Sequence, residues 1–372
     1  MKRYMLIVAL AAVLVGAVCL RGRARPIAIL DGQVREIVAG PRGVFWIETP
    51  VSGDGVATGD GPCRVVGVPH GGGRPVVIAQ EYDLRSVFLD GDRLLIIGST
   101  GPEIDKGQLI VLDLNSGQRT VHSGLHRPRC IWANGERMCW AEGREARGAS
   151  VVHVPVLQHL QAIRAGNGNP GTARLLGVAE SSRPHFSGQI LGSDGRYYYW
   201  AERVGEGLSE GAMTLRRCPE NGGEVETVGR AAGPNVGLLT PDSLVWTAYS
   251  EEMSTPGSGR CARMLPLSGG EARTVTDWLP SSGALVSVGR TVWYGGAGYL
   301  WRIPNKLGVP IPVSRTGASG PGQAAVYACN TYSQEQLEDK AVVMRRPISL
   351  WGRVRAALSL PGSLKAAGQV AQ

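Results

Sequence analysis

The chain has 372 residues, of which 43% are hydrophobic and 19% charged, so it holds enough apolar side chains for a large buried core. Its 53 glycines follow no collagen-like period, which indicates many turns rather than long helices. The net charge is +8, but residues 1–25 contribute +5 and residues 334–372 contribute +3, which leaves the central 308 residues neutral. A nucleic-acid-binding domain carries a basic face of its own, so the sequence predicts no nucleic-acid partner.

The amino terminus predicts a signal peptide or a signal anchor over residues 1–25. Lys2 and Arg3 precede an uncharged run over 5–20, the pattern of a secretory signal. Sixteen residues are short for a spanning helix, which needs roughly 17–25. Cleavage after Ala17, an uncleaved anchor and a lipoprotein at Cys19 all stay open, as does the orientation. In each case we expect a cell-envelope protein, membrane-anchored or exported to the periplasm or the exterior.

Short hydrophobic segments recur along the chain at intervals of 44–60 residues. Five of them centre on a tryptophan and one on an isoleucine, at Trp46, Ile96, Trp140, Trp200, Trp246 and Trp293. A second segment with a Pro and Gly ending follows, clearest at 68–73, 218–223 and 265–270. Asp90-Gly91, Asn134-Gly135 and Asp194-Gly195 precede tryptophan or isoleucine segments, as two-residue hairpin turns with positive φ. Four antiparallel strands per repeat are typical of a β-propeller blade, and six copies predict six blades.

The pattern resembles the six-bladed β-propellers of the YWTD and TolB-like types. In the YWTD repeat an aspartate follows the tryptophan by two positions, and here that place is taken by Glu48, Glu142 and Glu202. Thr247 follows Trp246 as in the motif, whereas other copies lack the acid, so the resemblance over about 33–315 is degenerate. It implies architecture rather than function, because propellers host many activities. We expect the tryptophans to fill the wedges between neighbouring blades.

The loops predicted between the second and third strands of the blades are long, and function concentrates on such loops. Over 50–62, 99–107, 143–149, 204–211 and 250–259 they hold nine acidic residues against three basic ones. We expect this acidic face to bind a cationic peptide, an exposed protein segment or Ca²⁺; ordinary solvated loops are the alternative. The candidate binding residues are Asp54, Asp60, Glu103, Asp105, Glu206, Glu210, Glu251 and Glu252.

Two histidines stand at matching points in the connectors between blades. His126 and His185 precede Trp140 and Trp200 by fourteen and fifteen residues, and such connectors open near the central channel. They are further candidate binding residues, able to hold a metal or polarise a substrate. No third ligand is identifiable, so neither a metal site nor a catalytic residue is predicted.

Six cysteines remain beyond Cys19, an even number that suits an exported protein. If Asn134-Gly135 forms a two-residue turn, Cys130 faces Cys139 in a non-hydrogen-bonded pair, where the Cβ atoms come closest. The sequence thus predicts a disulfide between these two residues, with buried free thiols as the alternative.

Two short motifs imitate the oxyanion loop and nucleophile elbow of an α/β-hydrolase, at His70–Gly73 and over 207–211. The first motif aligns with the Pro and Gly endings of other repeats, which predicts a hairpin turn. The hydrolase order also requires a histidine after the serine, and the last histidine of the chain is His185. A hydrolase of that family is therefore not expected.

Residues 334–372 are predicted to form a basic, partly helical tail, because apolar residues recur at helical spacing over 350–358. This helix would dock on the propeller or lie on a membrane surface. The predicted fold is all-β: a six-bladed β-propeller over 26–333 with an N-terminal signal or anchor and a short helical tail.

The predicted function is a non-enzymatic envelope module that binds a protein or peptide, or acts as a scaffold, through its acidic face. The alternative is a propeller enzyme, a metal-assisted lactonase or hydrolase with its site at the channel mouth. No cofactor is predicted apart from Ca²⁺ as an option, and the oligomeric state is left open.

Overall fold

The computed structural model describes residues 24–50, 62–99, 101, 106–126, 128–135, 137–148, 156–166, 174–181, 188–202, 212–232, 237–249, 260–279, 283–288, 291–296, 299–303, 311–315, 324–327, 330–337 and 340–347. These residues form strands and turns and contain no helix. Within them, no segment qualifies as a membrane-crossing helix. The segments 1–23 and 348–372, which hold the predicted signal or anchor and the predicted tail helix, lie outside this range.

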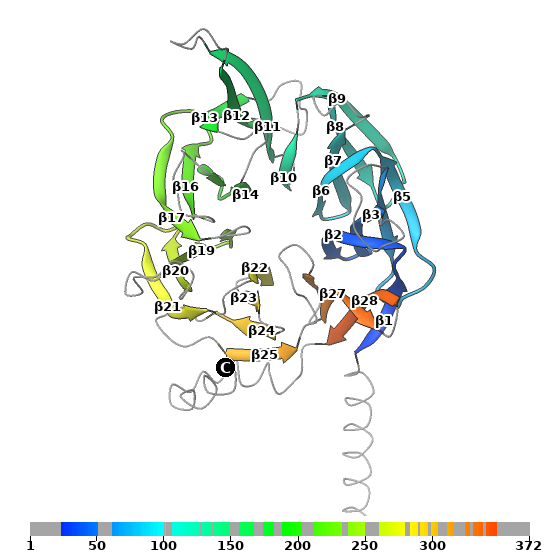
Figure 1. Cartoon of the computed structure of the whole chain (residues 1–372). Coiled ribbons are helices and arrows are strands. Elements are labelled where there is room, and N and C mark those ends of the chain that lie inside the picture. Colours follow the sequence, from blue (N-terminus) through cyan, green and yellow to red (C-terminus); the bar gives the residue numbers. More distant parts are fainter. Residues whose placement is uncertain are drawn as a thin grey trace, which may run out of the picture.

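The described strands form seven four-stranded antiparallel sheets, arranged as blades around a central opening (Figure 1). The first three blades are β2 (Gly32–Gly40), β3 (Gly43–Pro50), β4 (Cys63–Val68) and β5 (Val76–Glu81); β6 (Asp83–Asp90), β7 (Arg93–Ser99), β8 (Gly107–Asp113) and β9 (Arg119–Leu125); and β10 (Arg129–Asn134), β11 (Arg137–Gly148), β12 (Val156–Gly166) and β13 (Arg174–Ser181).

The next three blades are built in the same order, from the inner strand outward. They are β14 (Gly188–Ser193), β15 (Tyr197–Glu202), β16 (Ala212–Pro219) and β17 (Glu226–Ala232); β18 (Gly237–Leu239), β19 (Ser243–Tyr249), β20 (Arg260–Pro266) and β21 (Arg273–Leu279); and β22 (Gly283–Val288), β23 (Thr291–Gly296), β24 (Tyr299–Arg302) and β25 (Ile311–Arg315).

The seventh blade joins the two ends of the propeller, and it corrects the prediction of six blades. Its strands are β26 (Ala324–Tyr327), β27 (Asn330–Leu337), β28 (Lys340–Pro347) and β1 (Arg25–Ile29), which pairs with β28 as the outermost strand. The blade escaped the sequence repeat because its fourth strand comes from the other end of the chain and because it carries Tyr332 on its second strand instead of a tryptophan. The predicted boundary at residue 333 is also wrong, since β27 and β28 extend the propeller to residue 347.

The tryptophan repeat forms the core between blades, as predicted. Trp46, Trp140, Trp200 and Trp246 are fully buried on second strands, Trp293 is buried on β23, and Ile96 takes the corresponding place on β7. In the third and fourth blades the indole nitrogen also donates to the buried glutamate two residues later, at 2.9 Å for Trp140–Glu142 and 2.8 Å for Trp200–Glu202. Side chains alternate between the two faces of a strand, so residues i and i+2 lie on the same face. The glutamate can therefore reach the indole nitrogen of the tryptophan.

The predicted turns between third and fourth strands are present in repeated form. The N–H groups of Gly72, Gly222 and Gly269 each donate to the carbonyl of a proline three residues earlier, at 2.9, 3.0 and 3.2 Å. The His70–Gly73 run is thus a hairpin turn, as predicted. Its imidazole joins two blades: Nε2 lies 2.7 Å from the Gly40 carbonyl oxygen, and Nδ1 lies 2.7 Å from the Tyr332 hydroxyl.

The turns between first and second strands begin one residue later than predicted. Asn134 is the last residue of β10 and pairs with Arg137, so Gly135, with φ 61°, opens the turn. The same shift occurs where Asp90 pairs with Arg93 and Gly91 has φ 61°.

Candidate functional site: the arginine mouth of the channel

The innermost strands of the blades line the central opening (Figure 1). Those of the first three blades carry bulges near their first residues. The pairing register shifts across Arg35 in β2, across Arg85 in β6 and across Cys130 in β10. A bulge re-aims the extra residue and leaves it outside the ladder. In two of the three blades the re-aimed residue is an arginine.

Three arginines from these strands gather around one carboxylate. Arg35 Nη1 donates to Asp83 Oδ1 at 3.1 Å and to the Leu84 carbonyl oxygen at 3.0 Å. Arg85 Nε donates to Asp83 Oδ2 at 2.7 Å. Burial opposes the ionisation of Asp83, but the hydrogen bonds and charges of Arg85 and Arg35 outweigh it and lower the pKa of this carboxyl. Arg129 is the third member, because it is near enough for the charges of Arg85, Asp83 and Arg35 to act on its guanidinium. We call Arg35, Arg85, Arg129 and Asp83 the arginine mouth.

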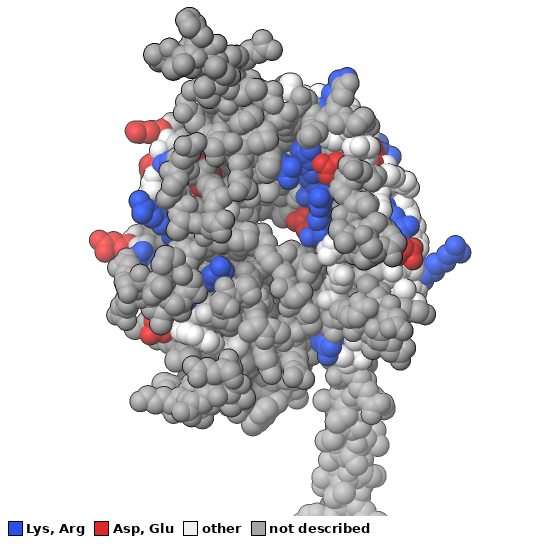
Figure 2. All heavy atoms as spheres, in the orientation of Figure 1, with Lys and Arg blue, Asp and Glu red and all other residues white. Residues whose placement is uncertain are grey.

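The arginine mouth has more guanidinium N–H donors than hydrogen-bond acceptors. The Arg85 side chain is only 3% exposed, yet its Nη1 has no hydrogen-bond partner among the residues that the structure describes. The buried Nε of Arg129 likewise has none. Burial, followed by the positive charge of Arg85, lowers the pKa of Arg129 to about 10, so the guanidinium stays charged near neutrality. Figure 2 shows basic side chains gathered beside the central opening on this face.

Glu36 lies next to Arg35 and bridges the first two blades. Its Oε2 accepts the N–H of Val87 in β6 at 2.9 Å. Burial raises the pKa of Glu36 to about 7, and the hydrogen bonds from Val87 and Ser86 offset only part of this rise. The side chain therefore adds little negative charge to the mouth below neutral pH.

The predicted disulfide between Cys130 and Cys139 is not formed. Because the turn starts one residue late, Cys139 pairs with Trp132, and Cys130 occupies the bulge with φ 45°. Both residues are free thiols. The Cys130 thiol donates to the Gly188 carbonyl oxygen in the next blade at 3.4 Å. Burial raises the pKa of both thiols, that of Cys130 to about 12, so neither is a ready nucleophile.

Arginines on the opposite face, at the turns between first and second strands, have a structural role. Arg42 pairs with Asp92 of the second blade at 2.8 Å, and Arg93 donates to the Gly135 carbonyl oxygen of the third. Arg137 pairs with Glu220 of the fourth blade at 3.4 Å. Each contact links one blade to the next in sequence.

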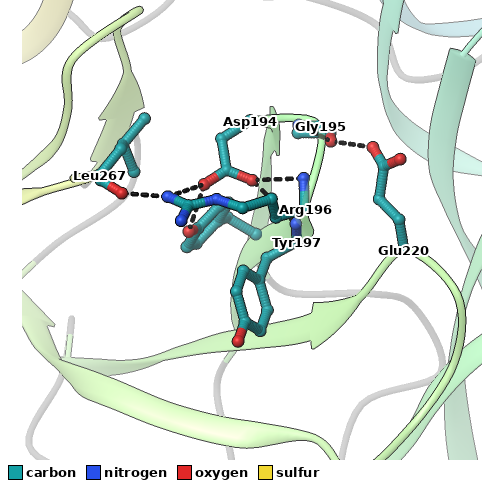
Figure 3. Close-up of polar contacts among 8 residues, drawn as sticks. Asp194, Gly195, Arg196, Tyr197, Glu220 and Leu267 are labelled. Atoms are coloured by element: carbon teal, nitrogen blue, oxygen red, sulfur yellow. Dashed lines mark hydrogen bonds and ion pairs between the residues drawn. The ribbon is translucent and has the colours of Figure 1, made fainter. Parts of the chain in front are cut away.

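The same link recurs between the fourth and fifth blades, where Arg196 donates to the Leu267 carbonyl oxygen (Figure 3). Figure 3 also shows Asp194 accepting the backbone N–H groups that follow it, with 2.8 Å to each of Arg196 and Tyr197. An open cleft of about 950 Å³ lies beside these groups, between the third and fourth blades. Its charged side chains, Arg137, Arg196 and Glu220, are engaged in these links, so we assign the candidate site to the arginine mouth instead.

Most of the predicted site residues are not described by the structure. Asp54, Asp60, Glu103, Asp105, Glu206, Glu210, Glu251, Glu252 and His185 lie outside the described residues. His126 is exposed directly after β9. The predicted loop over 143–149 is wrong up to residue 148, because Gly143–Gly148 pair with β12 as strand. Among the described residues, no group of three or more His, Cys, Asp or Glu side chains could hold a metal ion.

Sequence reasoning missed the arginine mouth, although a signal was present. An arginine follows an apolar residue or proline near the start of three consecutive first strands, in Val34-Arg35, Leu84-Arg85 and Pro128-Arg129. The prediction of an acidic face considers only charged residues in loops, and these three arginines lie on strands. Alternation along a strand would also not place them, because the bulges that aim Arg35 and Arg85 break that alternation.

No protein-family model matches the chain, and no curated protein matches its sequence. Solved structures do match its shape. An oligogalacturonate lyase in complex with manganese aligns with a TM-score of 0.53 and 12% identity, over 89% of this chain and 99% of that one. The β-propeller domain of the Trilobed protease from Pyrococcus furiosus aligns with a TM-score of 0.52 and 9% identity, over 84% and 94%.

An acylaminoacyl peptidase from Pyrococcus horikoshii aligns with a TM-score of 0.55 and 11% identity, over 88% of this chain and 54% of the peptidase. TolB from Acinetobacter baumannii aligns with a TM-score of only 0.40, too low to support a closer relation to that protein. These neighbours include both enzymes and a propeller domain taken alone, at identities where only architecture is comparable. The chain is similar to them as a β-propeller.

Proposed function

We propose that this protein is a ligand-binding propeller of the cell envelope whose arginine mouth takes an anionic oxygen group, a carboxylate or a phosphate, of a protein or peptide partner. The observation that carries the proposal is the pair of buried guanidinium nitrogens, on Arg85 and Arg129, that have no hydrogen-bond partner within the described part of the chain. A buried N–H donor is costly when it has no hydrogen-bond acceptor. An anion in the mouth would supply that acceptor.

The chemistry of the mouth favours an oxyanion. A guanidinium presents donors in a planar fork that matches carboxylate and phosphate oxygens, and charge-assisted hydrogen bonds are the stronger class. Three arginines face one aspartate here, so a net positive charge is left for a ligand. Part of the mouth is open to solvent, since the Arg35 side chain is 47% exposed.

Because of the predicted acidic face, we extend this proposal to a partner that carries both negative and positive groups. Gly32 at the start of β2 pairs with Pro50, and Asp83 at the start of β6 pairs with Ser99. The second strands of these two blades therefore end on the same side of the propeller as the arginine mouth. The predicted acidic loops follow these strand ends in the sequence. A peptide with a carboxylate for the mouth and cationic side chains for the loops would use both.

The test is calorimetric titration with citrate and with inorganic phosphate as probes, at low and at physiological salt. We expect binding by the parent protein, at least tenfold weaker binding by Arg129→Gln, and weaker binding as salt rises. Arg42→Gln is the matched control, because Arg42 is half exposed on the opposite face, and its binding should stay within twofold. If neither probe binds, or Arg129→Gln binds as the parent does, the mouth is not an anion site.

Charge reversal of Glu251 and Glu252 tests the acidic face separately. It should weaken binding of a cationic peptide, such as oligolysine, and leave phosphate binding unchanged. Unaltered oligolysine binding would exclude these two residues as its contacts.

A propeller enzyme is the second candidate, and Glu36 favours it. A carboxyl with a pKa of about 7 is suited to general acid–base chemistry, and Glu36 directly follows Arg35 in β2. Metal analysis of the native protein by mass spectrometry addresses the metal-assisted version. A stoichiometric transition metal lost in His126→Ala would favour it, whereas bound Ca²⁺ insensitive to that change would point to the acidic loops.

A further inference from the structure

The seam between the seventh and first blades has an open groove on the outer rim of the propeller. Its volume is about 640 Å³, and it lies between β1 of the seventh blade and β4 and β5 of the first. Ile27, Ile29, Pro75 and Val77 supply much of its apolar wall. The charged groups in it are largely paired with one another, since Arg64 binds Asp31 at 2.7 Å and Glu48 at 3.1 Å.

Exposed apolar side chains concentrate at this seam. Ile29, Val76 and Val77 are 57%, 59% and 49% exposed, the three highest values among the large hydrophobic residues that the structure describes as exposed. Ile29 and Val77 line the same groove. Val76 pairs with Gly67 on the opposite face of the first blade, so it is exposed on the rim but does not face the groove. The remaining two, Val121 and Trp278, stand on the outer strands of other blades. Clustered exposure of this kind marks an interaction surface, whereas single exposed residues do not.

The position of the seam in the chain indicates what covers it. The uncharged run over 5–20 ends five residues before Arg25, the first residue of β1. An extended chain covers at most about 3.6 Å per residue, so Arg25 lies within about 18 Å of the end of that run. If the run anchors the chain in a bilayer, the seam is held next to the headgroup layer.

The charge around the seam suits an anionic membrane surface. Arg25 and Arg74 are exposed beside the apolar residues, and Arg21 and Arg23 precede them in the sequence. Basic residues close to a membrane surface are attracted to anionic lipids, and apolar side chains beside them can enter the interface. A protein partner would not explain why basic and apolar groups gather where the apolar run ends.

We infer that the seam patch, formed by Ile29 and Val77 with Arg25 and Arg74, docks on the headgroup region of an anionic bilayer. The inference uses the predicted anchor but is independent of the arginine mouth. Docking there fixes the rotation of the propeller about its anchor, with the rim of the first and seventh blades against the membrane. It also covers β1, the strand that closes the ring on β28.

Spin labels on the full chain in bilayers containing phosphatidylglycerol test this inference. One label replaces Val77 in Val77→Cys, which lines the groove and is 49% exposed, and the matched control is Val121→Cys, on the outer strand of the second blade and 44% exposed. The signal of the equally treated unsubstituted chain is subtracted, because the protein has seven cysteines of its own. Oxygen and a water-soluble nickel chelate serve as the two relaxation agents.

We expect the ratio of oxygen to nickel accessibility at position 77 to rise at least threefold over that at position 121. The difference should shrink in Arg74→Glu and in bilayers of phosphatidylcholine alone. Equal ratios at the two positions would overturn the inference. A loss of access to both agents at position 77 would also overturn it, because it would show that protein, not lipid, covers the seam.

Discussion

Glu36 gives this propeller a stability that depends on pH in a direction opposite to that of most carboxylates. Burial raises its pKa from 4.5 to about 7, so the folded protein holds the protonated form more strongly than the unfolded chain does. Between these two values, folded molecules keep a proton that unfolded ones have lost, and the free energy of unfolding falls as pH rises. Above about pH 7 both states are ionised and this contribution no longer changes.

The magnitude follows from the size of the shift. Each pKa unit corresponds to about 1.4 kcal/mol, so a rise from 4.5 to about 7 destabilises the protein by up to roughly 3 kcal/mol above neutrality. This is an upper bound, because the Glu36 residue keeps an intermediate exposure. Glu36→Gln removes the titration and keeps an oxygen that can accept the Val87 N–H. The variant should be more stable than the parent at pH 8 by up to about 3 kcal/mol, with little gain near pH 4.5.

Denaturant unfolding of parent and variant at half-unit steps from pH 4.5 to 8.5 measures this difference. Subtracting the two curves cancels the groups that both proteins share. Glu224→Gln is the control, because it neutralises an exposed carboxylate just before β17 and leaves Glu36 in place. A constant difference between Glu36→Gln and the parent across this range would refute the assignment of a raised pKa.

Three further outcomes are expected. Glu202→Ala leaves the buried indole N–H of Trp200 without its acceptor and should lower the free energy of unfolding by about 1–3 kcal/mol, measured by denaturant titration; a cost below about 0.5 kcal/mol would contradict this role. Tyr332→Phe removes a hydrogen bond across the seam and should cost about 0.5–1.5 kcal/mol, with a lower thermal midpoint and unchanged circular dichroism. Peptide mapping under non-reducing conditions should find Cys130 and Cys139 unlinked, and a linked peptide would favour the predicted hairpin register over the observed one.

Local chemistry was enough to predict the repeating parts of the fold. The tryptophan spacing identified the buried second strands, because a large ring recurring once per repeat has to fill equivalent wedges. The sequence Pro-His-Gly-Gly identified a hairpin turn, because its glycine is needed at a positive φ, which Gly72 adopts at 80°. These features depend on a few neighbouring residues, so the sequence carries them directly.

Register was harder to predict, because a shift of one residue changes every partner in a strand pair. The turn after Asn134 begins one position later than its dipeptide indicated, and this moves Cys139 opposite Trp132. The bulge at Cys130 then removes the remaining cysteine from the ladder. A single turn and a single bulge together decided that no disulfide could form.

The seventh blade and the arginine mouth were decided only by tertiary structure. β1 and β28 are more than 300 residues apart, and nothing in either segment names the other as its partner. Arg35, Arg85 and Arg129 meet because three blades bring their first strands to one opening, two of them with an arginine in the bulge. The sequence by itself determined an all-β repeat with buried tryptophans; how many blades closed the ring, and which charges met at its centre, followed from contacts between residues far apart in the chain.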